Sequence, residues 1–241
     1  MGVVGPGVPG WVDVESSDFD RAKAFYLGLF GWEPAGPDDG YVMFTLNGQA
    51  VAGGSALSSP DRASVWSTYV IVADAGDTAA KATAAGGEVL TAPVTIGDQG
   101  AMAMFRDPSG AEICVWQPGT MFGGEVFNEP GSLTWNELVT ADPAAAKPFY
   151  RAVFGWETEG DDGTRWLLDG AEIASMTPAV TDRPPHWAVT FSVASCLETA
   201  ALAASLGGTV LEPPTEMPLG GRSARLQDPT GAQFLVSSFD D

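Results

Sequence analysis

Residues 25–33 read FYLGLFGWE, and residues 149–157 read FYRAVFGWE, which places the second stretch 124 positions after the first. A second signature also recurs, because Asp107 opens the run DPSGAE and Asp228 opens DPTGAQ, 121 positions later. Self-similarity at a fixed offset is the mark of an internal repeat. A domain of about 120 residues has therefore been duplicated, and each copy must form a similar scaffold.

The repeat sets the expected domain organisation. A chain of 241 residues lies between one large domain and two ordinary ones, and the duplication favours two. The Gly- and Pro-rich stretch that separates the copies is the natural linker. We expect a first domain over residues 1–118, a linker over 119–131 and a second domain over 132–241.

Composition restricts the class of partner. The chain is 45% hydrophobic and 17% charged, so each copy can bury a core. A net charge of −20 repels phosphate backbones and anionic lipid, which argues against nucleic acid and membranes as partners. The sequence holds no apolar run long enough to span a bilayer and no signal peptide, so a cytoplasmic protein is expected. Cys114 and Cys196 occupy unrelated positions of the two copies and are predicted to be free thiols.

The first helix of each copy is the clearest element. Asp18 and Asp142 are predicted N-caps, and Gly31 and Gly155 are predicted to end the two helices. Between them, apolar residues recur at the helical period, which predicts a stripe that packs against a sheet. The stripe consists of Ala22, Phe25, Tyr26, Leu29 and Phe30, matched by Ala146, Phe149, Tyr150, Val153 and Phe154.

Strand patterns surround these helices. One strand precedes each helix, two short ones follow, and the pattern then restarts with a strand and an Ala-rich helix that ends in Gly-Gly. The Asp-Pro-Ser/Thr-Gly runs suit type I turns between the last two strands. We therefore predict an α+β fold: two tandem domains, each of two βαβββ modules that form a curved, mostly antiparallel sheet cup. The predicted strands include 11–15, 41–46, 50–54, 65–72, 135–139, 165–168, 172–176 and 187–193.

Together, the helix signature A-x-x-FY-x-x-x-FGW and the Asp-Pro hairpins resemble the vicinal oxygen chelate superfamily, which comprises glyoxalases, bleomycin-resistance proteins and extradiol dioxygenases. The resemblance covers nearly the whole chain and is closest to tandem glyoxalase-like hydroxylases of high-GC bacteria. It implies the two-cup fold, but the superfamily supports many unrelated chemistries on one scaffold.

The resemblance also implies where a metal would bind. Metal-dependent members place His, Glu or Gln on the first strand, in the middle of the sheet, on the restart strand and on the last strand of each cup. The corresponding residues include Trp11, Thr68 and Cys114 in the first copy, and Trp135, Val189 and Leu235 in the second. These side chains do not form a matched ligand set, and His186 is the only histidine. We expect no metal and no cofactor.

If the ligand positions point into the cup, strand alternation predicts which neighbours do so too. Two inward carboxylates, Asp13 and Glu137, occupy equivalent positions in the copies and are the candidate catalytic residues. The other inward residues would line an aromatic ligand-binding cup: Trp11, Glu15, Trp66, Thr68, Glu112, Cys114, Trp116, Trp135, Trp187, Phe191 and Gln233.

Two structural alternatives stay open. The large aromatics can simply fill the cup as solid packing. The carboxylates Asp13 and Glu137 can also be structural, paired with Arg106, Arg222 or Arg225, because a buried charge needs a partner.

Three functions are compatible with this sequence. The leading hypothesis is metal-free binding, by sequestration or handling, of a bulky, largely apolar or aromatic small molecule such as a secondary metabolite. The alternative is a metal-independent tailoring enzyme (a lyase, cyclase, isomerase or oxygenation partner) that acts on a polyketide-like substrate through an inward carboxylate. A metal-dependent glyoxalase or dioxygenase is third. A monomer or a homodimer is expected, since the covalent duplication can supply both halves of a composite cleft.

Overall fold

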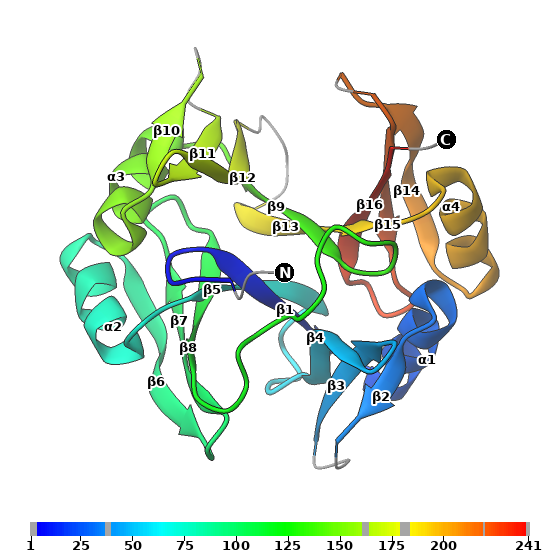
Figure 1. Ribbon diagram of the computed structural model, residues 1–241, viewed down its shortest axis with the longest axis horizontal. Coiled ribbons are helices and arrows are strands. Elements are labelled where there is room, and N and C mark those ends of the chain that lie inside the picture. Colours follow the sequence, from blue (N-terminus) through cyan, green and yellow to red (C-terminus); the bar gives the residue numbers. More distant parts are fainter. Residues whose placement is uncertain (1–3, 37–39, 161–163, 179–183, 219, 240–241) are drawn as a thin grey trace. The chain divides into compact units, whose positions relative to one another are not determined.

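The computed structural model describes residues 4–36, 40–160, 164–178, 184–218 and 220–239. The two copies have the same order of elements (Figure 1). The first copy runs β1 (Pro9–Ser16), α1 (Phe19–Phe30), β2 (Glu33–Ala35), β3 (Tyr41–Leu46), β4 (Gln49–Ala56), β5 (Val65–Ile71), α2 (Ala75–Ala84), β6 (Glu88–Ile96), β7 (Gly100–Arg106) and β8 (Glu112–Pro118). The second runs β9 (Leu133–Thr140), α3 (Pro143–Phe154), β10 (Glu157–Glu159), β11 (Arg165–Leu168), β12 (Ala171–Pro178), β13 (His186–Ser192), α4 (Cys196–Ser205), β14 (Thr209–Glu216), β15 (Arg222–Gln227) and β16 (Gln233–Ser238).

The strands form two eight-stranded mixed sheets, one from each copy. Their orders are β2-β3-β4-β1-β5-β8-β7-β6 and β10-β11-β12-β9-β13-β16-β15-β14. Within each βαβββ module the first strand runs parallel to the last, as in β1 with β4 and β5 with β8, whereas the hairpins are antiparallel. The predicted α+β fold of two tandem sheets, each built from two βαβββ modules, is confirmed.

The caps of α1 and α3 are those that the sequence predicts. The side chain of Asp18 accepts a hydrogen bond from the backbone N–H of Arg21, and Asp142 accepts one from Ala145. Gly31 and Gly155 end the helices in the left-handed conformation, which glycine adopts without steric cost. The five buried residues of each helix are the predicted apolar stripe.

Contacts divide the chain into two compact units that do not coincide with the two copies. Unit 1 comprises residues 1–11, 67–123 and 135–188, and unit 2 comprises residues 12–66, 124–134 and 189–241. Each unit therefore combines one module from each copy, with α2 beside α3 in unit 1 and α1 beside α4 in unit 2 (Figure 1). The domain boundaries at 118 and 132 stay a prediction.

Each unit has its own hydrophobic core built from both copies. The core of unit 1 joins β7 and β8 residues to α3 residues, and that of unit 2 joins α1 residues to β13 and β16 residues. Examples from unit 1 are Phe105, Ile113, Phe149, Tyr150 and Trp156, and from unit 2 Phe25, Tyr26, Phe30, Phe191 and Phe234. Across the described ranges, the helices are too short or too polar to cross a membrane.

Candidate ligand-binding site

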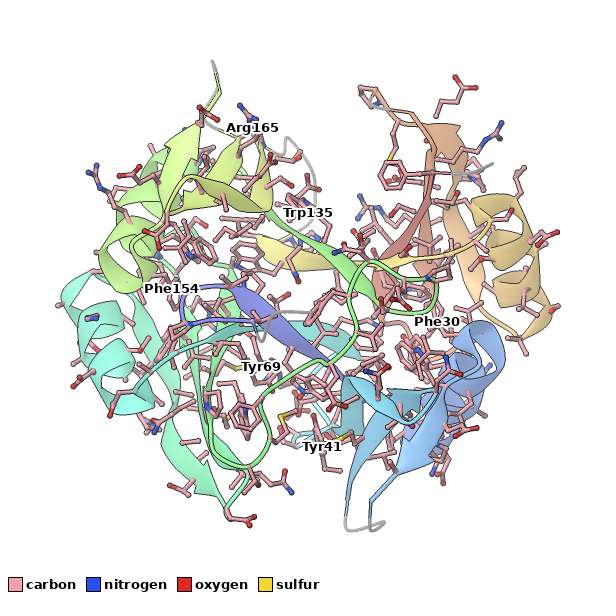
Figure 2. The ribbon with its side chains drawn as sticks, viewed as in Figure 1. Phe30, Tyr41, Tyr69, Trp135, Phe154 and Arg165 are labelled. Carbon is pink, nitrogen blue, oxygen red and sulfur yellow. The ribbon has the colours of Figure 1, made fainter. Side chains whose placement is uncertain are left out.

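A hydrogen-bonded carboxylate, Glu137, lies on one face of the β9–β12 ladder in unit 1. Parallel pairing places Ser175 directly opposite Glu137. Glu137 Oε1 accepts hydrogen bonds from Ser175 Oγ at 3.2 Å and from Thr177 Oγ1 at 2.7 Å. Trp135 Nε1 in turn donates to Ser175 Oγ at 2.8 Å. We call these four residues the Glu137 cluster, and Figure 2 shows the position of Trp135.

Strand alternation explains why this cluster is accessible. Leu138 is fully buried in the core of unit 1, and Asn136 on the same face of β9 is 3% exposed. Trp135 and Glu137 point to the opposite face and are only half-buried. Within the described residues, Glu137 Oε2 receives no hydrogen bond. The cluster thus presents an indole ring and a carboxylate whose orientation two hydroxyls fix.

The equivalent carboxylate of the first copy, Asp13, has different surroundings in unit 2. Val12 and Val14 enter the core, so Asp13 and Glu15 share the opposite face, where Asp13 is 7% exposed. Its partner in the ladder is Gly53, which has no hydroxyl to offer.

Tyr41 explains why glycine stands at position 53. A β-carbon on Gly53 would collide with the Tyr41 hydroxyl. The Tyr41 side chain therefore covers the strand where the second copy has Ser175. Glu15, on the same face as Asp13, lies 4.0 Å from Arg62.

On β8 in unit 1, alternate residues point to opposite faces of the sheet. Ile113 and Val115 enter the core, so Glu112, Cys114 and Trp116 share the other face. Cys114 is paired with Tyr69 of β5 and Met104 of β7, and Trp116 with Ile71 and Met102, which makes this surface apolar and rich in sulfur.

Among the predicted cup residues, Glu112 and Trp116 have structural contacts of their own, and two others lie on different strands. Arg106 forms an ion pair with Glu112 at 2.9 Å. Trp116 Nε1 donates to the Met121 carbonyl at 2.9 Å, and Trp11 is buried on β1. Gln233 of β16, in unit 2, is half-buried on the face opposite Phe234.

The predicted orientation of the two restart strands is wrong. Trp66 and Phe191 lie in the core of unit 2, where their rings contact at 5.0 Å between centroids. Trp187 lies in the core of unit 1, and Thr68 donates a hydrogen bond of 2.8 Å to buried Asn136. These four side chains therefore point away from the faces that carry Asp13 and Glu137.

The physical reason is that β5 and β13 are covered on both faces. Both alternating sets of side chains on β5 contain buried residues, for example Trp66 and Tyr69. Hydrophobicity therefore does not show which of the two sets faces the helices. The face opposite Trp66 carries Ser67, Tyr69 and Ile71 instead.

Two buried chains of hydrogen bonds were not foreseen. In unit 2, Trp66 Nε1 donates to Tyr26 Oη at 2.8 Å, and Tyr26 Oη donates to Asp228 Oδ2 at 2.9 Å. In unit 1, Trp187 donates to Tyr150 at 2.7 Å, and Tyr150 donates to Asp107 Oδ2 at 2.7 Å. Tyr, Trp and Asp recur in both copies, and this recurrence is the feature of the sequence that could have indicated the two hydrogen-bonded chains.

The aspartates of these chains also form the predicted hairpin turns. Asp107 Oδ1 accepts hydrogen bonds from the Ser109 backbone at 2.8 Å and the Ala111 backbone at 3.0 Å. Burial raises the pKa of Tyr26 and that of Tyr150 well above the ordinary 10.0, and the charge of Asp228 or Asp107 raises each further. Both tyrosines are therefore held as neutral hydrogen-bond donors.

The chain belongs to the Glyoxalase/Bleomycin resistance protein/Dioxygenase superfamily, whose family model matches residues 9–115 and again residues 132–236. Among curated relatives, CFP32 of Mycobacterium tuberculosis (strain CDC 1551 / Oshkosh) is 40% identical over 248 residues, covering 95% of this chain and 94% of that protein. The anthracycline biosynthesis protein DauV of Streptomyces sp. (strain C5) is 37% identical over 257 residues, covering 96% and 93%.

Solved structures agree on the fold. The Mn(II)-bound glyoxalase of Novosphingobium aromaticivorans superposes with a TM-score of 0.70 at 18% identity, covering 98% of this chain and 83% of that one. The 2,3-dioxygenase LapB of Pseudomonas sp. KL28 gives a TM-score of 0.69 at 17% identity, covering 98% and 93%.

The residues of this chain do not fit a metal of the kind that the glyoxalase structure holds. In the part of the chain that the structure describes, no three His, Cys, Asp or Glu side chains gather as a metal site. The Thr68 hydroxyl is already engaged by Asn136, and Trp11 and Trp135 carry no metal-binding atom suited to a divalent ion.

Proposed function

We propose that this protein binds a bulky, largely aromatic small molecule, such as a secondary metabolite, and that the Glu137 cluster fixes its polar end. The observation that carries the proposal is the half-buried indole of Trp135 beside a carboxylate held by Ser175 and Thr177. Aromatic side chains supply rigid contact area, and a few oriented polar groups supply specificity. Binding in this form requires no metal.

The relatives support this ligand class. DauV carries anthracycline biosynthesis in its name, as does DnrV of Streptomyces peucetius, which is 36% identical over 260 residues. Anthracyclines are planar, polycyclic and oxygenated, so their rings suit an indole and their hydroxyls suit a carboxylate. Natural-product biosynthesis is therefore the setting that we propose.

The test replaces Glu137 by Gln and measures affinity for an anthracycline aglycone by quenching of tryptophan fluorescence. Gln keeps the shape and an acceptor oxygen for Ser175 and Thr177 but removes the charge. We expect affinity to fall by about 1.5–3 kcal/mol, the usual worth of a hydrogen bond to a charged group, with the unfolding midpoint nearly unchanged.

Two matched variants serve as controls. Glu33→Gln removes one charge from exposed β2 and should leave affinity unchanged, and Asp13→Asn tests the carboxylate of the other copy. Equal affinity for the wild type and for Glu137→Gln would rule out the proposed polar contact.

An enzyme is the second candidate, because an oriented carboxylate can also move a proton. Glu137 or Asp13 would then act as general acid or base in a metal-independent lyase, cyclase, isomerase or oxygenation reaction. A Glu137→Gln variant that keeps affinity for the aglycone but loses its conversion would favour this enzyme over a binding protein.

A further inference from the structure

The face of the second sheet that carries the Glu137 cluster has an excess of carboxylates. Strand register places Glu159, Arg165, Ser175 and Glu137 in one row across β10, β11, β12 and β9. Residues directly opposite each other on neighbouring strands point to the same face, so these four side chains share it. Figure 2 labels Arg165 and Trp135 on these strands. The row thus holds two carboxylates and one cation, Arg165.

The cation of this row does not serve Glu137. Arg165 Nη2 pairs with Glu159 at 2.9 Å, and Arg165 Nη1 lies 3.7 Å from Glu172. Glu137 Oε1 is held instead by two neutral hydroxyls of the cluster, and none of the described lysine or arginine side chains forms an ion pair with Glu137. A half-buried carboxylate without an internal counter-ion can have its charge balanced by a cationic ligand.

The second copy makes an indole and a carboxylate accessible together, and the first copy does not. At the offset of 124, the counterparts of Trp135 and Glu137 are Trp11 and Asp13. Trp11 is 2% exposed and Asp13 is 7% exposed, whereas Trp135 and Glu137 are each half-buried. Solvent therefore reaches this pair of side chains on β9 but hardly at all on β1.

The two accessible groups are held in a fixed relation by a shared hydroxyl. Ser175 Oγ accepts a hydrogen bond from Trp135 Nε1 at 2.8 Å and donates one to Glu137 Oε1 at 3.2 Å. The indole uses its N–H edge for this bond, and the face of such a ring attracts a cation within about 6 Å of its centroid. Glu137 Oε2 receives no hydrogen bond from the described residues, so it can accept one from the same cation.

We propose that the Glu137 cluster selects aromatic ligands that carry a protonated amine, with the ammonium group between the Trp135 ring and Glu137 Oε2. This inference rests on the proposed function of the site and narrows its ligand class. A hydroxyl group can also donate to Oε2, but it has no charge to offset that of the carboxylate and gains little from the face of the indole. The net charge of −20 favours the approach of the same cationic ligands.

Two probes with the same ring system and the same side-chain length test this preference. Aminomethylanthracene is an ammonium ion at neutral pH, and hydroxymethylanthracene is neutral. The affinity of the full chain for each probe is measured by the fluorescence anisotropy of the anthracene at constant ionic strength. We expect the amine to bind about tenfold more tightly or better, because its hydrogen bond to Glu137 joins two charged groups.

The variant Glu137→Gln removes the charge and keeps an acceptor oxygen for both hydroxyls of the cluster. In this variant the amine and the alcohol should bind with affinities within about twofold of each other. Glu33→Gln is the matched control, since it removes the same charge from exposed β2 in unit 2 and should keep the preference for the amine. Loss of the preference in Glu33→Gln as well would show that the general negative field attracts the amine, which overturns the proposal.

The other outcomes separate this inference from the proposed function. Equal affinity of the wild type for the two probes would overturn the amine preference and leave the binding of aromatic molecules intact. A preference that Glu137→Gln retains would overturn it too, because the ammonium would then lie elsewhere. Binding of neither probe would also overturn the amine preference, and the proposed function itself fails only if the aglycone does not bind either.

Discussion

The two buried tyrosines, Tyr26 and Tyr150, are expected to contribute strongly to the free energy of unfolding. Each Tyr hydroxyl accepts from a tryptophan and donates to an aspartate, so all three polar groups are satisfied without water. Removing one hydroxyl would leave a buried carboxylate oxygen and a buried indole N–H without partners, which costs about 1–3 kcal/mol for each group. The tyrosines are therefore expected to control stability rather than ligand binding.

The raised tyrosine pKa values predict loss of stability in alkali. Below pH 10.0 the tyrosines are protonated in both the folded and the unfolded chain, so their contribution is complete. As the pH rises above the unfolded pKa, the unfolded chain releases these protons while the folded protein retains them, and unfolding becomes easier.

Urea unfolding between about pH 9 and 11 should show a fall of up to about 1.4 kcal/mol per pH unit for each tyrosine. A Tyr26→Phe/Tyr150→Phe variant should lose this part of the pH dependence, although it starts from a lower stability. If its slope matched that of the wild type, the two tyrosines would not be the titrating groups.

Two tryptophans that look alike in the sequence should respond in opposite ways. Trp187→Phe removes a donor to Tyr150 from the core and should lower the free energy of unfolding by about 1–3 kcal/mol, with aglycone affinity retained. Trp135→Phe changes a half-buried ring and should cost less than about 1 kcal/mol of stability while weakening ligand binding. Measuring the free energy of unfolding and the aglycone affinity for both variants distinguishes a core tryptophan from a ligand-binding one. Reversed effects would contradict the assignment of Trp187 to the core and Trp135 to the site.

At the scale of elements, the sequence predicted the structure correctly where its hydrophobic pattern allowed a single interpretation. The stripe Phe25, Tyr26, Leu29 and Phe30 has one apolar face and one cap, so both its helix and its burial were predictable. Strands β5 and β13 carry apolar residues on both faces. Which of the two faces enters the core depends on the side of the sheet that the helices cover. That information lies in tertiary packing, which is why Trp66 and Trp187 were assigned to the wrong face.

The candidate site was predictable only in part for the same reason. Trp135 and Glu137 follow from alternation on a strand with one buried face. Ser175 and Thr177 lie 38 and 40 positions beyond Glu137 and reach it only through the register of β9 with β12. Register between strands that are distant in sequence depends on the whole sheet, so these partners required the structure.

The hairpin between β7 and β8 should be more sensitive than an ordinary turn. Asp107 holds its own turn through Oδ1 and the α3 tyrosine through Oδ2, and is 3% exposed. Asp107→Ala should therefore lower the free energy of unfolding by about 3 kcal/mol or more, since several hydrogen bonds to one charge are lost together.

The exposed N-cap of α2 supplies the comparison for that measurement. Asp74 accepts one cap hydrogen bond, from the Asp77 backbone at 2.8 Å, and Asp74→Ala should cost about 1 kcal/mol. Both values follow from urea midpoints at neutral pH, and equal losses would mean that the link from Asp107 to Tyr150 contributes little.

At the scale of the whole molecule, the composite cores predict how the chain responds to cleavage. Each unit takes one module from each copy, so residues 1–123 and 124–241 each contain half of both cores. Expressed alone, each fragment would expose a large apolar surface and should show no cooperative unfolding transition.

Expressed together, the two fragments should associate and unfold as one species. Co-purification through a tag on one fragment, followed by a urea transition, measures this. Independent cooperative folding of either fragment would contradict it and would favour the domain boundaries expected from the repeat alone.

The aspartate–tyrosine contacts also bear on how the two copies change over generations. Tyr26 depends on Asp228, 202 positions away, and Tyr150 depends on Asp107, so each copy's hairpin serves the other copy's helix. A substitution at Tyr26 would accordingly find its suppressor at Asp228 and not at Asp107 of its own copy. The duplicated halves can diverge elsewhere, as the different strand partners of Asp13 and Glu137 show, yet a substitution at any of these four positions affects both copies together.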